Sequence, residues 1–196
     1  MKVKREKVVD YTKNPLAIIS DAAKKLLKYK KSGSVLDVGT GTGRNALFLA
    51  KKGFGVTALD SVKSKLVELK KIAKSQRVPL KFIHINITRY RPSKKYDVVL
   101  ALVSLHFLKA KQVPKIIKRM KEYTKDGGLN VVSVHTTKNT NKSSYRPHLF
   151  KRNELKKYYS DWQILEYNEA WGHLFRTTPN SKPVKKHRAE IIARKI

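Results

Sequence analysis

A glycine-rich loop follows the first buried strand that the sequence predicts, and its residue types suit close contact with a ligand. It reads Asp37-Val-Gly39-Thr-Gly41-Thr-Gly43-Arg44. At the carboxyl end of a strand in an open α/β sheet, glycines let the backbone approach a ligand, and backbone amides and a helix N-terminus face the same crevice. A dinucleotide fingerprint needs its third glycine where this chain has Arg44, and no Gly-Lys-Ser/Thr of a Walker loop occurs. The loop therefore disfavours NAD and excludes a Walker-type nucleotide site.

Polar side chains end the next two predicted strands. Asp60 follows Val56-Thr-Ala-Leu59, and Asn86 follows Lys81-Phe-Ile-His-Ile85. Because the carboxyl ends of parallel strands meet at one edge of a sheet, both side chains are expected beside the glycine loop. A carboxylate there can accept from both hydroxyls of a ribose, and an amide offers a donor and an acceptor to an adenine edge. Together the three features indicate a ligand-binding site.

The elements that must position these groups alternate along the chain. Asn14 and Pro15 predict the start of a first helix that runs to about Tyr29. The apolar patterns then predict strand 34–39, a helix after the glycine loop, strand 55–59, helix 62–75, strands 80–85 and 96–103, helix 112–123 ended by Asp126-Gly127-Gly128, and strand 129–134. Such alternation implies a mostly parallel sheet covered on both faces, the α/β class.

The last third of the chain predicts a short helix at 153–159 and strands at 162–167 and 189–193. No internal repeat or low-complexity linker interrupts the sequence, so residues 1–196 are expected to form one domain. Within it, 1–31 form an N-terminal helical segment and 32–196 the core. The segment 135–147 is polar and lacks periodicity, which predicts a mobile loop.

The charge balance of this chain is unusual. Its 196 residues include 45 Lys and Arg against 14 Asp and Glu, a formal net charge of +31, so balanced ion-pair networks are excluded. With 40% hydrophobic residues, the chain has enough apolar material for a core, which argues against disorder. The absence of cysteine excludes disulfides, thiolate metal sites and a cysteine nucleophile, and no metal site is expected.

The sequence also carries signals about location. Its basic N-terminus has no apolar region followed by a small-residue cleavage site, so it does not read as a secretory signal. The longest wholly apolar stretch near the middle, 98–103, is far shorter than the about 20 residues of a membrane helix. We therefore expect a soluble cytoplasmic protein without membrane association. Few Met and many Lys residues suggest a thermophilic source.

The glycine loop, Asp60 and Asn86 together resemble the class I S-adenosylmethionine-dependent methyltransferases. The resemblance implies S-adenosylmethionine as the cofactor and a single-domain Rossmann-like fold, a seven-stranded, mostly parallel sheet whose last strand is antiparallel. It also implies that Gly39, Thr40 and Gly41 lie against the methionine part, Asp37 at its amino group, Asp60 at the ribose, and Asn86 with Ile87 at the adenine. Ser61, Leu102 and Val103 are further expected cofactor-binding residues. Those enzymes usually have Asp at the adenine position, so Asn86 keeps the acceptor oxygen and loses the charge.

Several collinear stretches are similar, more specifically, to the tellurite-resistance methyltransferase (TehB) family. They are Gly41-Thr-Gly-Arg-Asn45, Leu105-His-Phe-Leu108, Thr124-Lys-Asp-Gly-Gly128, Glu154-Leu-Lys-Lys-Tyr-Tyr159, Tyr167-Asn-Glu169, Gly172-His-Leu-Phe-Arg-Thr177 and Ala193-Arg-Lys195. Members of this family transfer a methyl group to tellurium or selenium oxyanions. The resemblance therefore implies a small acceptor that is anionic or a soft nucleophile.

The same resemblance implies where the acceptor binds. Arg176 falls on the family's substrate-site arginine and is the first candidate for holding an oxyanion through its fork of donors. The family's histidine directly before that arginine is replaced by Phe175, while His173 lies two residues earlier. A second family arginine has no match, with Pro183 near its place.

Two further residues are candidates for the site. His106 follows the fourth predicted strand, where it could accept a proton at neutral pH. Tyr11, in the N-terminal segment, could close over the cofactor. A packing role remains an alternative for each.

The excess of cations supports a second hypothesis, an RNA or protein methyltransferase that binds its substrate through a basic surface. Against a base-modifying enzyme, the fourth strand is not followed by an Asn/Asp-Pro-Pro-aromatic motif, and the lysines look dispersed over helix faces. A catalytically inactive cofactor-binding scaffold is a third possibility. The sequence leaves the oligomeric state open.

Overall fold

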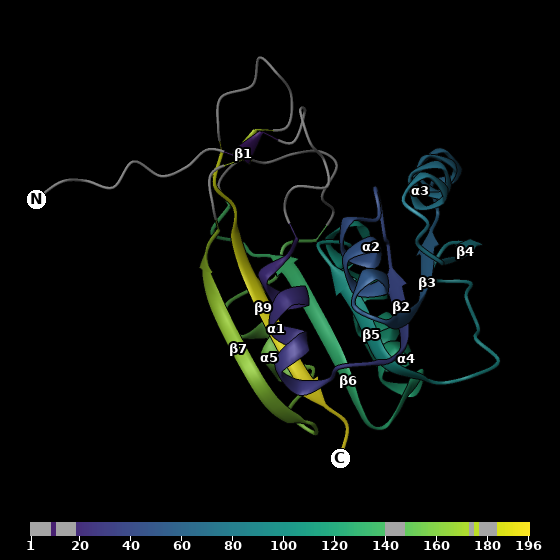
Figure 1. The fold of residues 1–196 in the computed structure, drawn as a ribbon. Helices are drawn as coiled ribbons and strands as arrows, with labels where there is room; N and C mark the ends of the chain where they lie inside the picture. The colour runs from purple at the N-terminus through teal and green to yellow at the C-terminus, as the bar shows by residue number, and fades with distance from the viewer. Residues whose placement is uncertain (1–8, 11–18, 140–147, 173–174, 177–183) are drawn as a thin grey trace, which may run out of the picture.

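The described part of the chain centres on a seven-stranded sheet in the order β4-β3-β2-β5-β6-β9-β7 (Figure 1). In this computed structural model the described residues are 9–10, 19–139, 148–172, 175–176 and 184–196. In spatial order the strands span Lys81–His84, Phe54–Asp60, Gly33–Val38, Tyr96–Leu102, Thr124–His135, His187–Arg194 and Gln163–Trp171. Two short strands, β1 (Val9–Asp10) and β8 (Phe175–Arg176), pair in parallel beside this sheet.

The direction of the strands agrees with the sequence-based expectation. From β4 to β6 every neighbouring pair is parallel, whereas β9 is antiparallel to both β6 and β7. The predicted seven-stranded α/β fold with an antiparallel last strand is therefore confirmed. The division of the chain into 1–31 and 32–196 stays a prediction.

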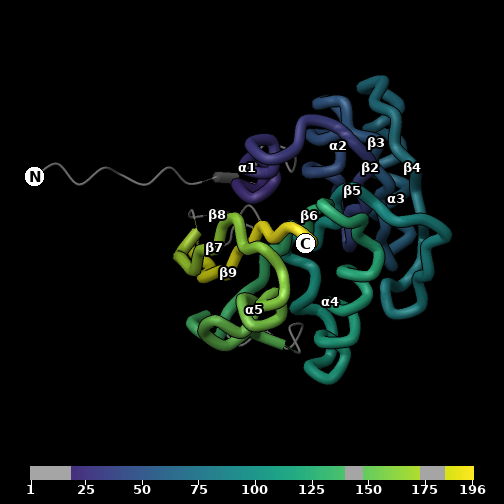
Figure 2. Tube along the Cα trace, turned by 90° about the horizontal axis from the view of Figure 1, so that it is seen from below, coloured from purple at the N-terminus to yellow at the C-terminus, as the bar shows by residue number. Residues whose placement is uncertain are grey.

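Helices cover both faces of the sheet (Figure 2). One face carries α1 (Asp21–Tyr29), α2 (Arg44–Lys51) and α3 (Lys63–Ser75), and the other carries α4 (Val113–Glu122) and α5 (Glu154–Lys157). The inner strands β2, β3 and β5 are buried from both sides and read as nearly continuous apolar runs, whereas the helices bury one stripe each. Within the described ranges, none of the helices is long and apolar enough to cross a membrane.

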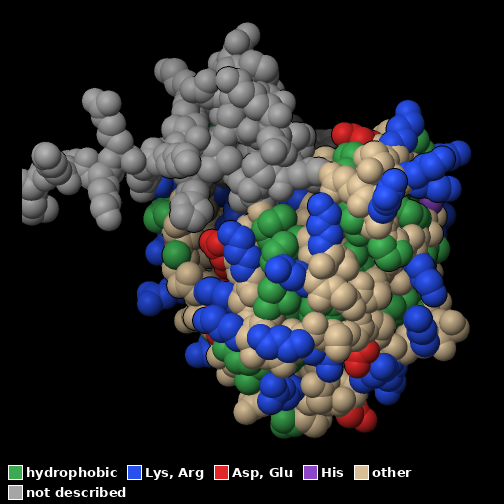
Figure 3. All heavy atoms as spheres, viewed as in Figure 1, with side chains coloured by type: hydrophobic (Ala, Val, Ile, Leu, Met, Phe, Trp, Pro, Cys, Tyr) green, Lys and Arg blue, Asp and Glu red, His purple; other side chains and the backbone are tan. Residues whose placement is uncertain are grey.

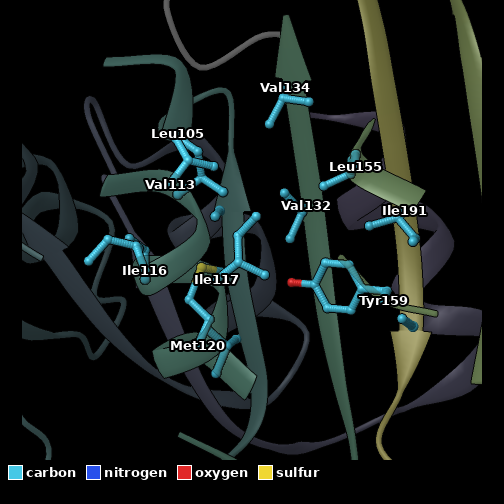
Figure 4. Close-up of a cluster of buried hydrophobic side chains, with 14 of the residues drawn as sticks. Leu105, Val113, Ile116, Ile117, Met120, Val132, Val134, Leu155, Tyr159 and Ile191 are labelled. Carbon is cyan, nitrogen blue, oxygen red and sulfur yellow. The ribbon is translucent and has the colours of Figure 1, made fainter. Parts of the chain in front are cut away.

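The hydrophobic core between α4 and the sheet holds the turn that follows β5 in place. Ile117 and Met120 of α4 lie against Val132 of β6 and the buried ring of Tyr159 (Figure 4). Leu105, the first residue of the short 3₁₀ turn η1 (Leu105–Phe107), belongs to the same cluster. The turn after β5 is thereby anchored in the hydrophobic core.

The first helix starts later than the sequence predicts. The prediction placed its start near Pro15, and residues 11–18 lie outside the described ranges. In the described part, α1 begins at Asp21, because Ser20 has an extended backbone (φ −56°, ψ 137°). The N–H of Ser20 donates to Oδ1 of Asn45 in α2, at 3.0 Å. This long-range contact, which local periodicity does not reveal, sets the start of the helix.

The sequence Asp126-Gly127-Gly128 does not end α4 as predicted but lies inside β6. The helix ends at Glu122, and the strand begins at Thr124, whose hydroxyl donates to the Met120 carbonyl at 2.7 Å. A register shift against β5 accommodates the glycines, and the N–H of Gly127 donates to the Lys195 carbonyl at 3.0 Å.

The loop predicted at 135–147 is fixed at its beginning. His135 is the last residue of β6, and both Thr136 and Asn139 are buried. The amide of Asn139 donates to the carbonyls of Thr136 and His187, each at 2.8 Å. The remainder of the predicted loop, 140–147, lies outside the described residues.

Candidate functional site

A cleft of about 650 Å³ opens at the carboxyl ends of β2, β3 and β5. Its volume lies in the range of small-molecule sites. Among the residues predicted to bind a cofactor, those that line it are Asp37, Gly39, Thr40, Gly41, Asp60, Ser61, Asn86, Ile87, Leu102 and Val103. Tyr11 lies outside the described residues. The topology thus brings together groups that are far apart in the sequence, and their roles toward a cofactor stay predictions.

The glycine loop is fastened to the end of β3 through its backbone. The N–H groups of Gly39 and Thr40 both donate to the Leu59 carbonyl, at 2.8 and 3.0 Å, and that of Gly43 donates to the Thr40 carbonyl at 3.0 Å. The sequence-based expectation that the loop amides face the crevice is therefore wrong for these groups. Buried N–H groups need acceptors, and the end of the neighbouring strand supplies one.

Two glycines of the loop, Gly39 and Gly41, lack a side chain for different structural reasons. Gly39 has φ +71°, and a Cβ there would lie 2.6 Å from Cβ of Ser104, so the β5 end touches the loop. Gly41 has φ +58°, and a Cβ there would meet no atom within 4 Å. Gly39 thus permits close packing of two strand ends, whereas Gly41 leaves open space for a ligand.

The Asp60 side chain links the glycine loop to the segment that connects β3 with α3. Its Oδ2 accepts the N–H of Gly41 at 2.8 Å, and its Oδ1 accepts the N–H of Val62 at 2.9 Å. The side chain is buried. Because each carboxylate oxygen can accept two hydrogen bonds, one position on each oxygen remains for a pair of ligand hydroxyls.

Asp37, at the end of β2, is a buried acid with a perturbed pKa. Its Oδ2 accepts the Thr40 hydroxyl at 2.7 Å. Burial raises the pKa of the Asp37 carboxyl to about 6; the neighbouring Asp60 also raises it, while Thr40 and Arg44 oppose the rise. A cationic group of a ligand placed beside Asp37 would favour its ionised form.

The side-chain amide of Asn86 offers a ligand fewer hydrogen-bonding groups than the sequence suggests. Its Oδ1 already accepts the N–H of Thr88 at 2.9 Å and the Thr88 hydroxyl at 2.8 Å, as in an Asx turn. Both lone-pair positions of the amide oxygen are therefore used. The expectation that this amide offers a donor and an acceptor is corrected, since the NH₂ group is the part left for a ligand.

The turn after β5 contains backbone strain that the sequence does not signal. Val103 has φ +61°, a left-handed conformation that is unfavourable for a β-branched residue. Its N–H donates to the Ser133 carbonyl of β6 at 2.8 Å. Strain of this kind persists where the surroundings enforce it and is concentrated at functional sites.

Other residues that line the cleft were not predicted as site residues. Arg44 and Asn45 line the cleft, as do Lys65, Ser104 and Phe107. Lys65 is one of many lysines, so its position carries no signal in the sequence. Phe107 is a hydrophobic residue at the end of the short turn η1 that follows β5, and its position in the cleft is visible only in the fold.

The predicted acceptor-side residues are not brought together in the described part. His106 is buried and is not among the described residues that line the cleft; its ring lies 4.6 Å from that of His135. Arg176 pairs through β8 with Asp10 of β1, and only its backbone is described. His173 lies outside the described residues. The catalytic roles of these three residues stay predictions.

Comparison with known proteins places the chain in a family. A family profile described as "Tellurite resistance protein TehB" matches residues 1–192. The "Probable S-adenosyl-L-methionine-dependent methyltransferase TehB" of Haemophilus influenzae is 35% identical over 178 residues, which cover 90% of this chain and 61% of that protein. This chain thus spans about three fifths of the length of that curated relative.

Solved structures agree with this placement. The crystal structure of TehB from Haemophilus influenzae superposes with a TM-score of 0.84 at 32% identity, covering 95% of this chain and 65% of that one. Burkholderia thailandensis 1,6-didemethyltoxoflavin-N1-methyltransferase, solved with S-adenosylhomocysteine, gives a TM-score of 0.70 at 19% identity, covering 89% and 76%. At that identity the likeness concerns the fold alone. The resemblance drawn from sequence motifs is confirmed, and the chain belongs to the TehB family of S-adenosylmethionine-dependent methyltransferases.

Proposed function

We propose that this chain binds S-adenosylmethionine in the cleft at the ends of β2, β3 and β5 and transfers its methyl group to a small acceptor. The observation that carries the proposal is the pair of buried carboxylates, Asp37 and Asp60, that line this cleft of a protein with a net charge of +31. Buried acids are costly unless they are partnered. The ammonium group and ribose hydroxyls of S-adenosylmethionine are suitable partners for them.

The residues have distinct tasks in this proposal. Asp37 holds the ammonium group of the methionine part, and Asp60 accepts the ribose hydroxyls with its two remaining lone-pair positions. Gly41 supplies the space in which the ligand approaches the backbone. The NH₂ of Asn86 donates to a ring nitrogen of adenine. When bound, S-adenosylmethionine supplies an electrophilic methyl group and leaves as a neutral thioether.

The acceptor in our proposal is a small anion with a soft lone pair, of the tellurite or selenite class. Such a nucleophile needs no strong general base, so the protein has only to place it in line with the methyl group and exclude water. Support comes from Arg44 and Lys65, two cations that line the cleft, and from the description of the matching family. Arg176 is proposed as the residue that binds the oxyanion.

A nucleic-acid acceptor is the second candidate, and the observation that favours it is the cationic surface. Figure 3 shows Lys and Arg side chains spread over the visible face with few carboxylates among them. A surface of this kind attracts phosphates without selecting a base. The cationic surface therefore supports binding of RNA more than methylation of RNA at a particular site. A small acceptor remains our first candidate for the substrate.

The experiment has two stages. Calorimetry with S-adenosylmethionine and S-adenosylhomocysteine tests cofactor binding. The expected Kd is in the micromolar range, which corresponds to a binding free energy on the order of −8 kcal/mol. The absence of heat with both compounds would refute the proposal. Labelled cofactor is then offered with tellurite, selenite, small thiols, bulk RNA and a protein extract. Turnover on RNA alone would replace the first acceptor class by the second.

Arg176→Ala separates acceptor binding from cofactor binding. We expect this variant to lose turnover and to keep the cofactor Kd of the unmodified protein. Arg152→Ala is the matched control, because Arg152 is exposed and does not line the cleft. Equal losses of turnover and cofactor affinity in Arg176→Ala would assign that arginine a folding role instead.

A further inference from the structure

The helix α3 carries cations that lack acidic partners. Residues 63–81, which form α3 and the start of β4, include seven Lys and Arg and a single acid, Glu68. In the part of the chain that the structure describes, none of these seven cations forms an ion pair. A group of like charges without counter-charges nearby creates a positive potential that attracts anions from solution.

Several cations elsewhere in the molecule have acidic partners. The carboxylate oxygens of Glu166 in β7 lie 3.2 Å from Nζ of Lys25 and 3.6 Å from Nζ of Lys28, both in α1. Lys121 of α4 pairs with Asp161. Helix α3 lies at the other end of the sheet from β7 (Figure 1), and Figure 3, in the same view, shows Lys and Arg side chains over it. The positive charge is thus partly compensated at the β7 end and uncompensated at α3.

Three of the α3 lysines form a straight row, which we call the α3 stripe: Lys63, Lys70 and Lys74. A helix turns by about 100° per residue, so these side chains leave α3 within about 40° of one another, over about 16 Å of its axis. All three are exposed. Leu69 and Ala73, on another side of the helix, are buried in the core. The α3 stripe therefore faces solvent.

The α3 stripe points away from the proposed cofactor site. Lys65 lines the cleft, whereas no residue of the α3 stripe is among the described residues that line it. By the same helical geometry, the Lys65 side chain leaves α3 about 160° from the middle of the stripe. A partner bound along the α3 stripe is therefore not presented to the cleft.

A row of exposed lysines suits the phosphate backbone of a nucleic acid strand. Such a strand offers negative charges at regular intervals, and each phosphate that a lysine neutralises releases counterions. A membrane surface fits less well, because helices that lie on membranes insert an apolar face into the lipid. The apolar side of α3 is already packed in the core, and a single large apolar residue of this helix, Val67, is exposed, at 47%.

From these observations we propose that the α3 stripe binds the phosphate backbone of a nucleic acid strand without reading its bases, and that the bound strand is not the methyl acceptor. Ammonium groups form charge-assisted hydrogen bonds with phosphate oxygens, and such contacts carry no base specificity. The small acceptor keeps the cleft, because the stripe and the cleft lie on different sides of α3. The protein thus has a second binding surface, whose occupancy does not depend on the identity of the acceptor.

Fluorescence anisotropy with a labelled oligouridylate of about 12 nucleotides, long enough to span the stripe, tests the proposal. The triple variant Lys63→Gln, Lys70→Gln, Lys74→Gln should bind this probe more than about tenfold more weakly than the unmodified protein, since three phosphate contacts are lost. The slope of log K against log[salt] should become less steep by about 2, because each phosphate contact to a single strand contributes roughly 0.7. Gln has nearly the helix propensity of Lys, so the thermal midpoint should be retained.

The matched control removes three exposed lysines at and beside α4, on the other face of the sheet: Lys111→Gln, Lys115→Gln, Lys118→Gln. Both triple variants have the same net charge, so the control should keep the affinity for oligouridylate to within about threefold. Equal losses of affinity in the two variants would overturn the proposal, because net charge alone would then account for binding. An unchanged affinity in the stripe variant would overturn it as well.

Two further measurements distinguish the partner and the role of the bound strand. Vesicles of phosphatidylglycerol should bind both triple variants alike; a loss confined to the stripe variant and to vesicles would assign the surface to membranes. With labelled cofactor, transfer of methyl groups to the oligouridylate would contradict the separation from the cleft. Absence of cofactor binding by the unmodified protein would instead refute the proposed function, and it would leave the affinity of the α3 stripe for the oligouridylate unchanged.

Discussion

The carboxylate of Asp60 accepts the backbone N–H of Gly41, with 2.8 Å between Oδ2 and N. Asp60 ends β3 and Gly41 lies in the loop after β2, so one hydrogen bond joins the ends of neighbouring strands at the cleft. The side chain proposed to accept the ribose is thus also the one that shapes the glycine loop. Substitutions at Asp60 should change both the free energy of unfolding and the affinity for the cofactor.

Asp60→Ala tests this double role. The change leaves the N–H groups of Gly41 and Val62 without their acceptor, which should lower the free energy of unfolding by about 1 to 3 kcal/mol. Cofactor affinity should fall by roughly 10- to 100-fold, because charge-assisted bonds to the ribose are lost. Denaturant titration and calorimetry measure the two effects. Glu68→Ala, which removes an exposed carboxylate from α3, should change neither; an Asp60→Ala variant with unaltered affinity would remove Asp60 from the site.

The raised pKa of the Asp37 carboxyl predicts an unusual dependence of the free energy of unfolding on pH. Its carboxyl has a pKa of about 6 in the folded chain against 3.8 for the ordinary group, so the folded state binds the proton more tightly. The stabilisation is fully present below about pH 3.8 and is lost as pH rises through about 6, a change of roughly 2 to 4 kcal/mol. Asp37→Asn should therefore be more stable than the unmodified protein at pH 8 and of similar stability at pH 4. Chemical denaturation at both pH values measures the difference.

Without a ligand, the buried Asp37 carboxyl favours its protonated form. Bound cofactor should instead favour the ionised form, because its ammonium group is a cation beside Asp37. Affinity for S-adenosylmethionine should decrease as pH falls below about 6 in the unmodified protein. In Asp37→Asn the affinity should be lower at pH 8 and should lack this decrease. The same pH profile in both proteins would show that Asp37 does not contact the ammonium group.

Gly41→Ala separates backbone strain from contact with the ligand. The left-handed backbone (φ +58°) should cost about 1 kcal/mol of stability, and the added methyl group should reduce cofactor affinity by more than about tenfold, since it occupies open space in the cleft. Gly53→Ala is the matched control, because Gly53 has φ +90° and also meets no atom within 4 Å, but it does not line the cleft. Equal cofactor affinities in the two variants would place the ligand away from Gly41.

Much of the fold follows from local patterns in the sequence. The apolar runs of β2, β3 and β5 and the glycines after β2 are local signals, and they placed these elements to within a few residues. The start of α1 was misplaced because a contact from Ser20 to Asn45 sets it. The pairing of β1 with β8 was not predicted, since two-residue strands carry no periodicity.

The types of residues at the strand ends determined what kind of site this sequence could build. Asp37, Gly39, Gly41 and Asp60 identify the proposed cofactor-binding edge without coordinates, because each follows or ends a strand whose pattern is local. The tertiary structure alone decided that the loop N–H groups bond to the end of β3, that Asn86 has already used its amide oxygen, and that Phe107 faces the cleft. These properties depend on contacts between distant segments, and the pattern of neighbouring residues does not encode them.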